Sequence, residues 1–148
     1  VDKLKLEFNL DWTYWKPFES IIVDYTPPSM EDVDIRYDYH NTCAYKFGVE
    51  YLLTDSLALR GGYIYNESAT PERNWRPSVP DSDMHFFSFG TGYKIGGFTF
   101  DSAVLLIYYK DITINNNVGN NETTTASSID GKYKSLALEF SLGATYKF

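Results

Sequence analysis

The chain has 148 residues, enough for a single domain, and its formal net charge of −7 is the opposite of the basic footprint that nucleic-acid-binding proteins carry. Tyr, Phe and Trp make up 18% of the residues. Such side chains gather in bands at the membrane interfaces of β-barrels, although an aromatic-rich soluble β-sandwich has the same composition. The longest apolar run, Ala103–Tyr109, is far shorter than the roughly 18 residues of a transmembrane helix, so a membrane-spanning protein of this sequence has to be a closed sheet.

The first predicted element is a strand over residues 2–15. Its odd positions from Lys3 to Thr13 are polar or charged, whereas its even positions are apolar: Leu4, Leu6, Phe8, Leu10, Trp12 and Tyr14. A period of two predicts a strand with one apolar face. The segment is also long enough for the roughly 9–11 residues that cross a membrane at a tilt.

Five further segments repeat this alternation after a long connection over residues 16–41. They predict strands over residues 42–53, 56–66, 84–94, 97–110 and 132–148. Short turns follow the second and fourth strands, at Thr54-Asp55 and at Ile95–Gly97, and long loops follow the first, third and fifth. Because barrels have short periplasmic turns and long external loops, both ends of the chain are expected in the periplasm.

The face opposite the apolar side chains differs from the uniformly polar surface of a soluble sandwich. It mixes small residues with charges of both signs: Gly48, Gly62, Gly90, Gly92, Ala137, Gly143, Lys5, Glu7, Asp11, Lys46, Glu50, Arg60, Asp101 and Glu139. This mixture is typical of a crowded lumen with internal ion pairs. The sequence therefore predicts an all-β fold, an antiparallel transmembrane β-barrel, in which residues 1–148 supply about six strands.

Six strands are too few to enclose a lumen, because the smallest common membrane barrels have about eight. Two open edges in lipid would also leave backbone groups without partners. We therefore expect additional strands, either from an N-terminal portion that is missing here or from other copies of the chain. The first is favoured because the chain begins with Val-Asp-Lys inside a predicted strand. Cys43 is the only cysteine, so no internal disulfide forms.

Several motifs resemble the outer-membrane family of the long-chain fatty acid transporter FadL and the toluene-type hydrocarbon channels. The most specific are an Arg-x-Gly strand, a Pro-containing loop and a Pro-Asp before a Ser-x-Gly strand: Leu59–Tyr63, Asn66–Pro71, Val79–Asp81 and Ser88–Tyr93. Weaker ones are Asp11–Trp15, Gly48–Tyr51 and the ending Gly143–Phe148. The chain departs from the family at Ala69, where the loop usually has a Pro, and at Cys43, where an aromatic residue is common.

The resemblance implies the last six strands of a 14-stranded barrel in the bacterial outer membrane, without the family's N-terminal hatch. It implies passive uptake of a hydrophobic small molecule, either long-chain fatty acids or aromatic hydrocarbons. The expected partners are this ligand, outer-membrane lipid and lipopolysaccharide, the remaining barrel strands, and the barrel-assembly machinery, which would read the C-terminal Phe148. The alternative is a structural or accessory barrel subunit without transport of its own.

Two sets of residues are candidates for binding the ligand. The first long loop is unusually apolar, and Phe18, Ile22 and Tyr25 either form an external capture surface or fold into a small core of the loop itself. Arg36, Lys46 and Arg60 either meet the carboxylate of a fatty acid or, for the inward-facing Lys46 and Arg60, pair with acids inside the lumen.

A barrel enzyme is a third hypothesis, because some small barrels are surface hydrolases. His40 and His85 lie near the external ends of predicted strands, but no nucleophile motif accompanies them. The sequence also has no metal-ligand cluster and no glycine-rich phosphate loop. We therefore expect neither catalysis nor a cofactor.

Overall fold

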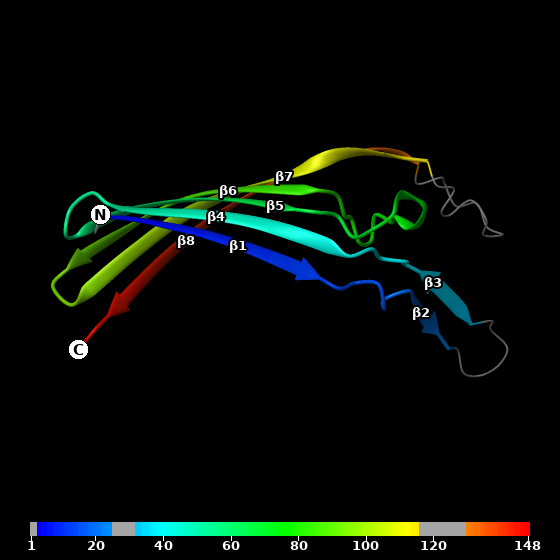
Figure 1. Ribbon diagram of the computed structural model, residues 1–148, viewed down its shortest axis with the longest axis horizontal. Coiled ribbons are helices and arrows are strands. Elements are labelled where there is room, and N and C mark those ends of the chain that lie inside the picture. Colours follow the sequence, from blue (N-terminus) through cyan, green and yellow to red (C-terminus); the bar gives the residue numbers. More distant parts are fainter. Residues whose placement is uncertain (1–2, 25–31, 116–129) are drawn as a thin grey trace.

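The computed structural model describes residues 3–24, 32–115 and 130–148, and its main element is a six-stranded antiparallel sheet (Figure 1). In sheet order the strands are β1 (Leu4–Thr13), β4 (Thr42–Leu52), β5 (Leu57–Asn66), β6 (Met84–Ile95), β7 (Phe98–Ile114) and β8 (Gly131–Tyr146). From β4 to β8 each strand pairs with the next one along the chain. The all-β antiparallel fold expected from the sequence is confirmed.

The sheet is curved, and its connections sort by length between its two ends (Figure 1). Both termini and the two short turns lie at one end, and the longer connections lie at the other. The turn after β4 is closed by Thr54, whose hydroxyl accepts from the backbone N–H groups of Ser56 and Leu57 at 3.2 and 3.0 Å. The turn after β6 requires a glycine, because Gly96 has a φ of +57°.

The connection between β1 and β4 contains a hairpin that the sequence analysis treated as loop. Its strands are β2 (Ser20–Val23) and β3 (Val33–Arg36), which pair in antiparallel register. The β-branched run Ile21–Val23 favours an extended backbone, and Ile21 lies opposite Ile35. The run was too short for its alternation to be recognised.

The ends of the long strands also differ from the predicted ones. β1 stops at Thr13 rather than at residue 15, because the N–H groups of Trp15 and Lys16 donate to the Asn41 side chain, both at 3.1 Å. β7 continues to Ile114 rather than ending at residue 110. A bulge follows Tyr109, after which the ladder with β8 resumes.

One face of the sheet, here called the apolar face, carries large exposed hydrophobic side chains on β1, β4, β6, β7 and β8. A single register row crosses the sheet near the ends with the longer connections: Leu10, Tyr45, Tyr65, His85, Tyr108 and Leu136. A second aromatic group lies at the turn end, where Phe98 and Tyr146 are 4.7 Å apart between ring centroids. These two aromatic bands match the two interfaces of a membrane, and the rows between them carry mainly Phe, Leu and Val.

The described residues bury few large side chains between layers, because the sheet has nothing packed on its apolar face. Leu6, Phe8, Phe140 and Leu142 are 63 to 89% exposed. An apolar patch of this extent is not stable in water and marks a surface that contacts lipid or protein. Within residues 3–24, 32–115 and 130–148, no helix is long and apolar enough to span a membrane.

Candidate functional site

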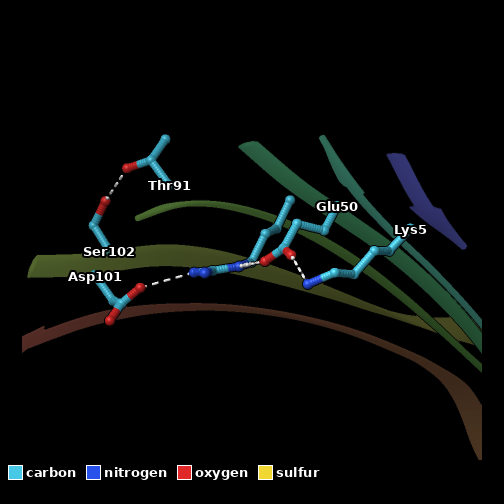
Figure 2. Close-up of polar contacts among 6 residues, drawn as sticks. Lys5, Glu50, Thr91, Asp101 and Ser102 are labelled. Atoms are coloured by element: carbon cyan, nitrogen blue, oxygen red, sulfur yellow. Dashed lines mark hydrogen bonds and ion pairs between the residues drawn. The ribbon is translucent and has the colours of Figure 1, made fainter. Parts of the chain in front are cut away.

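A chain of ion pairs crosses the opposite face of the sheet, here called the charged face. Glu50 accepts from Lys5 at 2.9 Å and from Arg60 at 2.7 Å, and Arg60 also donates to Asp101 at 2.7 Å (Figure 2). These residues come from β1, β4, β5 and β7. The planar guanidinium of Arg60 has enough donors to serve two carboxylates at once. Four strands are thereby connected by side chains as well as by backbone hydrogen bonds.

Arg60 reaches Asp101 across β6, because Gly92 leaves room for its guanidinium. A Cβ atom at Gly92 would lie 2.8 Å from Asp101 Oδ1 and 2.9 Å from the Nη1 atom of Arg60. The glycines on this face are therefore not interchangeable. By contrast, a Cβ at Gly48 would meet only the Cβ of Glu7, at 3.8 Å.

A second ion pair joins Lys46 of β4 to Asp11 of β1 on the same face. On the apolar face, Thr91 and Ser102 hydrogen-bond to each other at 2.8 Å between their hydroxyl oxygens (Figure 2). A hydroxyl that faces hydrocarbon needs a partner, and each of these two supplies the other's. Asp11, Lys46, Thr91 and Ser102 thus find their partners within the sheet.

Four aromatic rings gather where the connection between β1 and β4 leaves the sheet. Phe18 lies 5.2 Å from Tyr37 and 5.3 Å from Tyr39 between ring centroids, and Trp15 lies 5.8 Å from Tyr39. We call Trp15, Phe18, Tyr37 and Tyr39 the aromatic cluster. It forms the base of the β2–β3 hairpin, whose Ile22 side chain is 67% exposed.

Asp38 fastens this hairpin to the connection between β5 and β6. Its carboxylate accepts from the Asn74 side chain at 2.9 Å and from Arg73 at 3.5 Å. The hydrogen bond from Asn74, with a smaller contribution from Arg73, lowers the pKa of Asp38. Asp38 also has a φ of +47°, a conformation that Asp tolerates better than most residues. The two external connections are therefore joined.

Asp81 organises the connection between β5 and β6, here called the external loop (residues 67–83). One of its carboxylate oxygens accepts from the Ser68 hydroxyl, the Ala69 N–H and both the N–H and the hydroxyl of Thr70, at 2.8 to 3.0 Å. The carbonyl of Asp81 accepts from the Trp75 indole N–H at 2.8 Å. A single residue thus sets the path of both ends of the loop.

Trp75 and Asp83 attach the external loop to the ends of β7 and β8. The Trp75 side chain is only 2% exposed, and its ring lies 4.3 Å from that of Tyr133. Asp83 accepts from the Ser68 N–H at 3.1 Å and from Lys110 at 3.0 Å. The external loop and the part of β7 beyond Tyr109, here called the strand extension, therefore stabilise each other. This accounts for the length of β7.

A pocket of about 290 Å³ opens between the external loop and the end of β7. Trp75, Ile112 and Ile114 supply apolar walls, and Glu72 and Lys110 are among its polar lining residues. Ligand pockets for drug-sized molecules usually span about 300 to 1,000 Å³. At about 290 Å³ this pocket lies just below that range.

We predict that acid weakens the attachment of the external loop through Asp83. Burial raises the pKa of Asp83, but the Ser68 N–H and Lys110 outweigh it, so the pKa lies below its usual value. A carboxyl group whose folded pKa is depressed stabilises the fold above its unfolded pKa of about 3.9 and loses that contribution as the pH falls through the folded value. Hydrogen exchange of the external loop, compared between pH 5 and pH 3 after correction for intrinsic rates, should show loosening in the wild type. In D83N the loop should already be looser at pH 5, with a smaller further change; an equal acid response in both proteins would contradict this.

The structure places the predicted binding residues in three different settings. Phe18 belongs to the aromatic cluster, and Ile22 projects from the hairpin. Arg36 lies on β3, 3.4 Å from Asp34, and both side chains are largely exposed. Lys46 and Arg60 are engaged in the ion pairs of the charged face. Tyr25 lies outside the described residues.

The two histidines of the enzyme hypothesis are in unrelated positions. His85 lies on the apolar face, where its Nδ1 is 2.8 Å from the Tyr63 hydroxyl and its ring contacts those of Tyr65 and Tyr108. The backbone N–H of His40 donates to the Ala69 carbonyl. No contact between the two histidines occurs in the described part of the chain.

The sequence analysis overlooked the residues that organise the external end. Val79-Pro80-Asp81 was noted as a motif, but no role followed from it, because Ser68 and Thr70 are adjacent to Asp81 only after the loop has folded. Trp75 lies outside every segment with alternating side chains, so the alternation predicts no role for it. A lone Trp in a long polar loop is nevertheless a signal, since a side chain of that size normally buries against something.

A curved antiparallel sheet with two aromatic bands on its apolar face and ion pairs across its charged face is the wall of a transmembrane β-barrel. The apolar face contacts lipid, and the charged face lines the lumen. The chain belongs to the outer membrane protein transport protein family (OMPP1/FadL/TodX), whose family model matches residues 1–148.

Individual proteins resemble the chain over part of their own length. A 47 kDa outer membrane protein of Pasteurella multocida is 28% identical over 94 residues, which are 64% of this chain and 22% of that protein. Outer membrane protein P1 of Haemophilus influenzae is 26% identical over 64% of this chain and 20% of its own length. A putative outer membrane protein of Neisseria meningitidis serogroup B is 25% identical over 99% of this chain and 34% of its own.

Among solved structures, a FadL homologue of Pseudomonas aeruginosa superposes with a TM-score of 0.82 and 28% identity, over 99% of this chain and 33% of that one. The chain therefore spans between a fifth and a third of the length of these relatives. The family membership, the barrel fold and the outer-membrane location expected from the sequence are confirmed.

Proposed function

We propose that this chain forms part of a barrel that admits hydrophobic small molecules through the outer membrane by passive diffusion. The observation that carries the proposal is the β2–β3 hairpin, which presents Ile21 and Ile22 at the external end with 43 and 67% of their surface exposed. In this proposal the exposed Ile21 and Ile22 side chains form the first apolar surface that a ligand meets. The family to which the chain belongs is described as a transport family, which supports the same function.

In this proposal Ile22, Phe18 and Tyr25 belong to the capture surface. Ile22 offers its side chain directly, and Phe18 holds the base of the hairpin through the aromatic cluster. Burial of apolar ligand surface would supply affinity at roughly 25 cal/mol per Å². No bond is made or broken, so neither catalytic histidines nor a cofactor are needed.

A carboxylate ligand would meet Arg36 first. The side chain of Arg36 is 68% exposed and contacts Asp34 at 3.4 Å, so a ligand can compete for it at little cost. Lys46 and Arg60 would come next, inside the lumen, where the ligand would have to compete with Asp11, Glu50 and Asp101. We propose that Arg36 orients the incoming headgroup and that Lys46 and Arg60 contact it transiently.

Closure of the barrel belongs to the same proposal. Within the described residues β1 pairs only with β4 and β8 only with β7, so each has one edge without backbone partners. Such edges are not stable in lipid, and we propose that further strands complete the wall. Phe148 packs edge-on against Tyr146 beyond the end of β8, where the barrel-assembly machinery would read it. Outer-membrane lipid and lipopolysaccharide would cover the apolar face.

The test is uptake by cells that lack the protein and are complemented with the complete gene. Labelled oleate and labelled toluene should each enter faster than in uncomplemented cells, with saturation for at least one of them. Complementation that restores envelope integrity without any ligand-dependent uptake would instead favour an accessory barrel subunit. H40A and H85A variants that keep any hydrolytic activity of the wild type would leave no role for a catalytic histidine.

We predict that Ile22→Asp weakens capture without affecting assembly. Complete burial of an Ile side chain is worth about 1.5 to 3 kcal/mol. Partial burial against a ligand, about 1 kcal/mol, corresponds to roughly a fivefold rise in the half-saturation concentration for oleate. The matched control is Val79→Asp, which places the same charge on an exposed side chain of the external loop. Equal effects of the two variants would count against the hairpin as the capture surface.

A further inference from the structure

Two inward carboxylates lack a cation, and both lie on the edge strands of the sheet. Within the six strands most inward charges pair with a strand one or two places away: Lys5, Asp11, Lys46, Glu50, Arg60 and Asp101. Among described residues, Glu7 of β1 has only a hydrogen bond from Asn9, at 2.6 Å, and Glu139 of β8 has no ion pair. Lys94 also has none, but it precedes the end of β6 beside a turn, where water reaches it.

Glu7 and Glu139 lie on one continuous register row of the sheet. The row runs from Glu7 through Gly48, Gly62, Ser88 and Leu105 to Glu139. Neither carboxylate can reach a cation along this row, since its inner members are small or apolar. The cations nearest Glu7 on this face, Lys5 and Lys46, are engaged with Glu50 and Asp11. The remaining space for a partner is therefore across the open edge that each strand presents.

We infer that the strands flanking β1 and β8 in the closed barrel carry inward-facing Lys or Arg side chains next to Glu7 and Glu139. This inference rests on the closure proposed above. Its physical basis is the pattern within the sheet, in which an inward charge finds its partner on one of the next two strands. A carboxylate in a crowded lumen is stabilised in the same way by an adjacent cation.

A second copy of this chain does not fit the two open edges. In such a pair β1 of one copy would lie antiparallel to β8 of the other. The residue numbers of every directly opposed pair then have the same sum, so fixing one pair fixes all the others. If Glu139 lies opposite Lys5, then Glu7 lies opposite Ala137. If Glu139 lies opposite Lys3 instead, then Glu7 lies opposite Ser135. The inward face of β8 has no cation: Tyr133, Ser135, Ala137, Glu139, Ser141, Gly143 and Thr145.

Lys147 offers no way around this mismatch, because it lies beyond the end of β8. A register that brings Lys147 opposite Glu7 leaves Glu139 opposite Trp15, past the end of β1. Both carboxylates are satisfied together only by strands of different sequence, with basic residues facing inward.

Charge reversal in the complete protein, folded in detergent, tests the inference. Glu7→Lys and Glu139→Lys should each lower the temperature of barrel unfolding, followed by the heat-dependent gel shift, by about 5 °C. Glu19→Lys, the same change in the external connection, should leave it within about 1 °C. Reversing one inward Lys or Arg of the flanking strand to Glu in the same variant should restore at least half of the loss.

Three results would overturn the inference: unfolding of both edge variants at the wild-type temperature, restoration by residues of loops or of non-adjacent strands, or covalent cross-linking of β1 to β8 of a second copy. If a Lys variant does not assemble, Glu7→Gln and Glu139→Gln are compared in the same way, with a smaller expected drop. Oleate uptake is measured on the same proteins. Lost uptake at unchanged unfolding temperature would concern the transport proposal and not the strand partners.

Discussion

Replacing Trp75 by alanine is expected to detach the external loop from the strand extension while leaving the barrel wall intact. Trp75 is almost completely buried, its ring centroid lies 4.3 Å from that of Tyr133, and its indole N–H donates to the Asp81 carbonyl. Removing a buried Trp side chain costs about 3 to 5 kcal/mol. The loss of stability should be confined to the external loop and the adjoining ends of β7 and β8, because the membrane-spanning part of the sheet does not contact the Trp75 ring.

Hydrogen exchange followed by mass spectrometry measures this effect. Protection should fall in residues 67–83, at the end of β7 and at the start of β8, and should remain unchanged in β4 and β5. Trp75→Phe keeps a ring but loses the donor, so it should show an intermediate loss, of about 1 to 2 kcal/mol. Val79→Ala, a truncation of an exposed side chain in the same loop, is the matched control. Uniform loss of protection over the whole sheet would contradict the local role of Trp75.

Replacing Arg60 by leucine is expected to destabilise the wall itself. The change leaves Asp101 without its cation and Glu50 with Lys5 alone. Breaking a fully buried ion pair costs about 3 to 5 kcal/mol, but the Arg60 side chain is 44% exposed, so a loss of about 1 to 2 kcal/mol is expected. The temperature of the heat-dependent gel shift should fall accordingly.

Matched variants separate charge from geometry at Arg60. Arg60→Lys keeps the charge but cannot serve both carboxylates in one plane, so it should recover part of the loss. Gly92→Val, which fills the space occupied by the guanidinium, should lower the unfolding temperature by part of the amount seen for Arg60→Leu. Gly48→Ala should leave the unfolding temperature unchanged. Arg36→Leu, which removes an exposed cation from the hairpin, should leave the unfolding temperature unchanged. Full stability of Arg60→Leu would rule out a structural role for the ion-pair chain.

The alternation of side chains determined most of the wall by itself. A strand has a period of two, so the sequence of β1 separates Leu6, Phe8 and Leu10 from Lys5, Glu7 and Asp11 without reference to any other strand. The same period, repeated six times with short and long connections, predicted the sheet and its two faces. Strand ends were less predictable, because Asn41 stops β1 through a side chain that is distant in the sequence.

Only the tertiary structure decided which charges meet and how the external end is built. Arg60 bridges Glu50 and Asp101 because of the register of the strands and because Gly92 has no side chain in the space that the guanidinium occupies. The alternation of side chains specifies neither. Asp81 and Trp75 acquire their roles through contacts with residues outside any periodic segment. The physical reason is the distance in sequence over which each feature is determined. The face to which a side chain points is set within its own strand. Ion pairs, the contacts of the external loop and the open edges at β1 and β8 depend on which strands lie side by side.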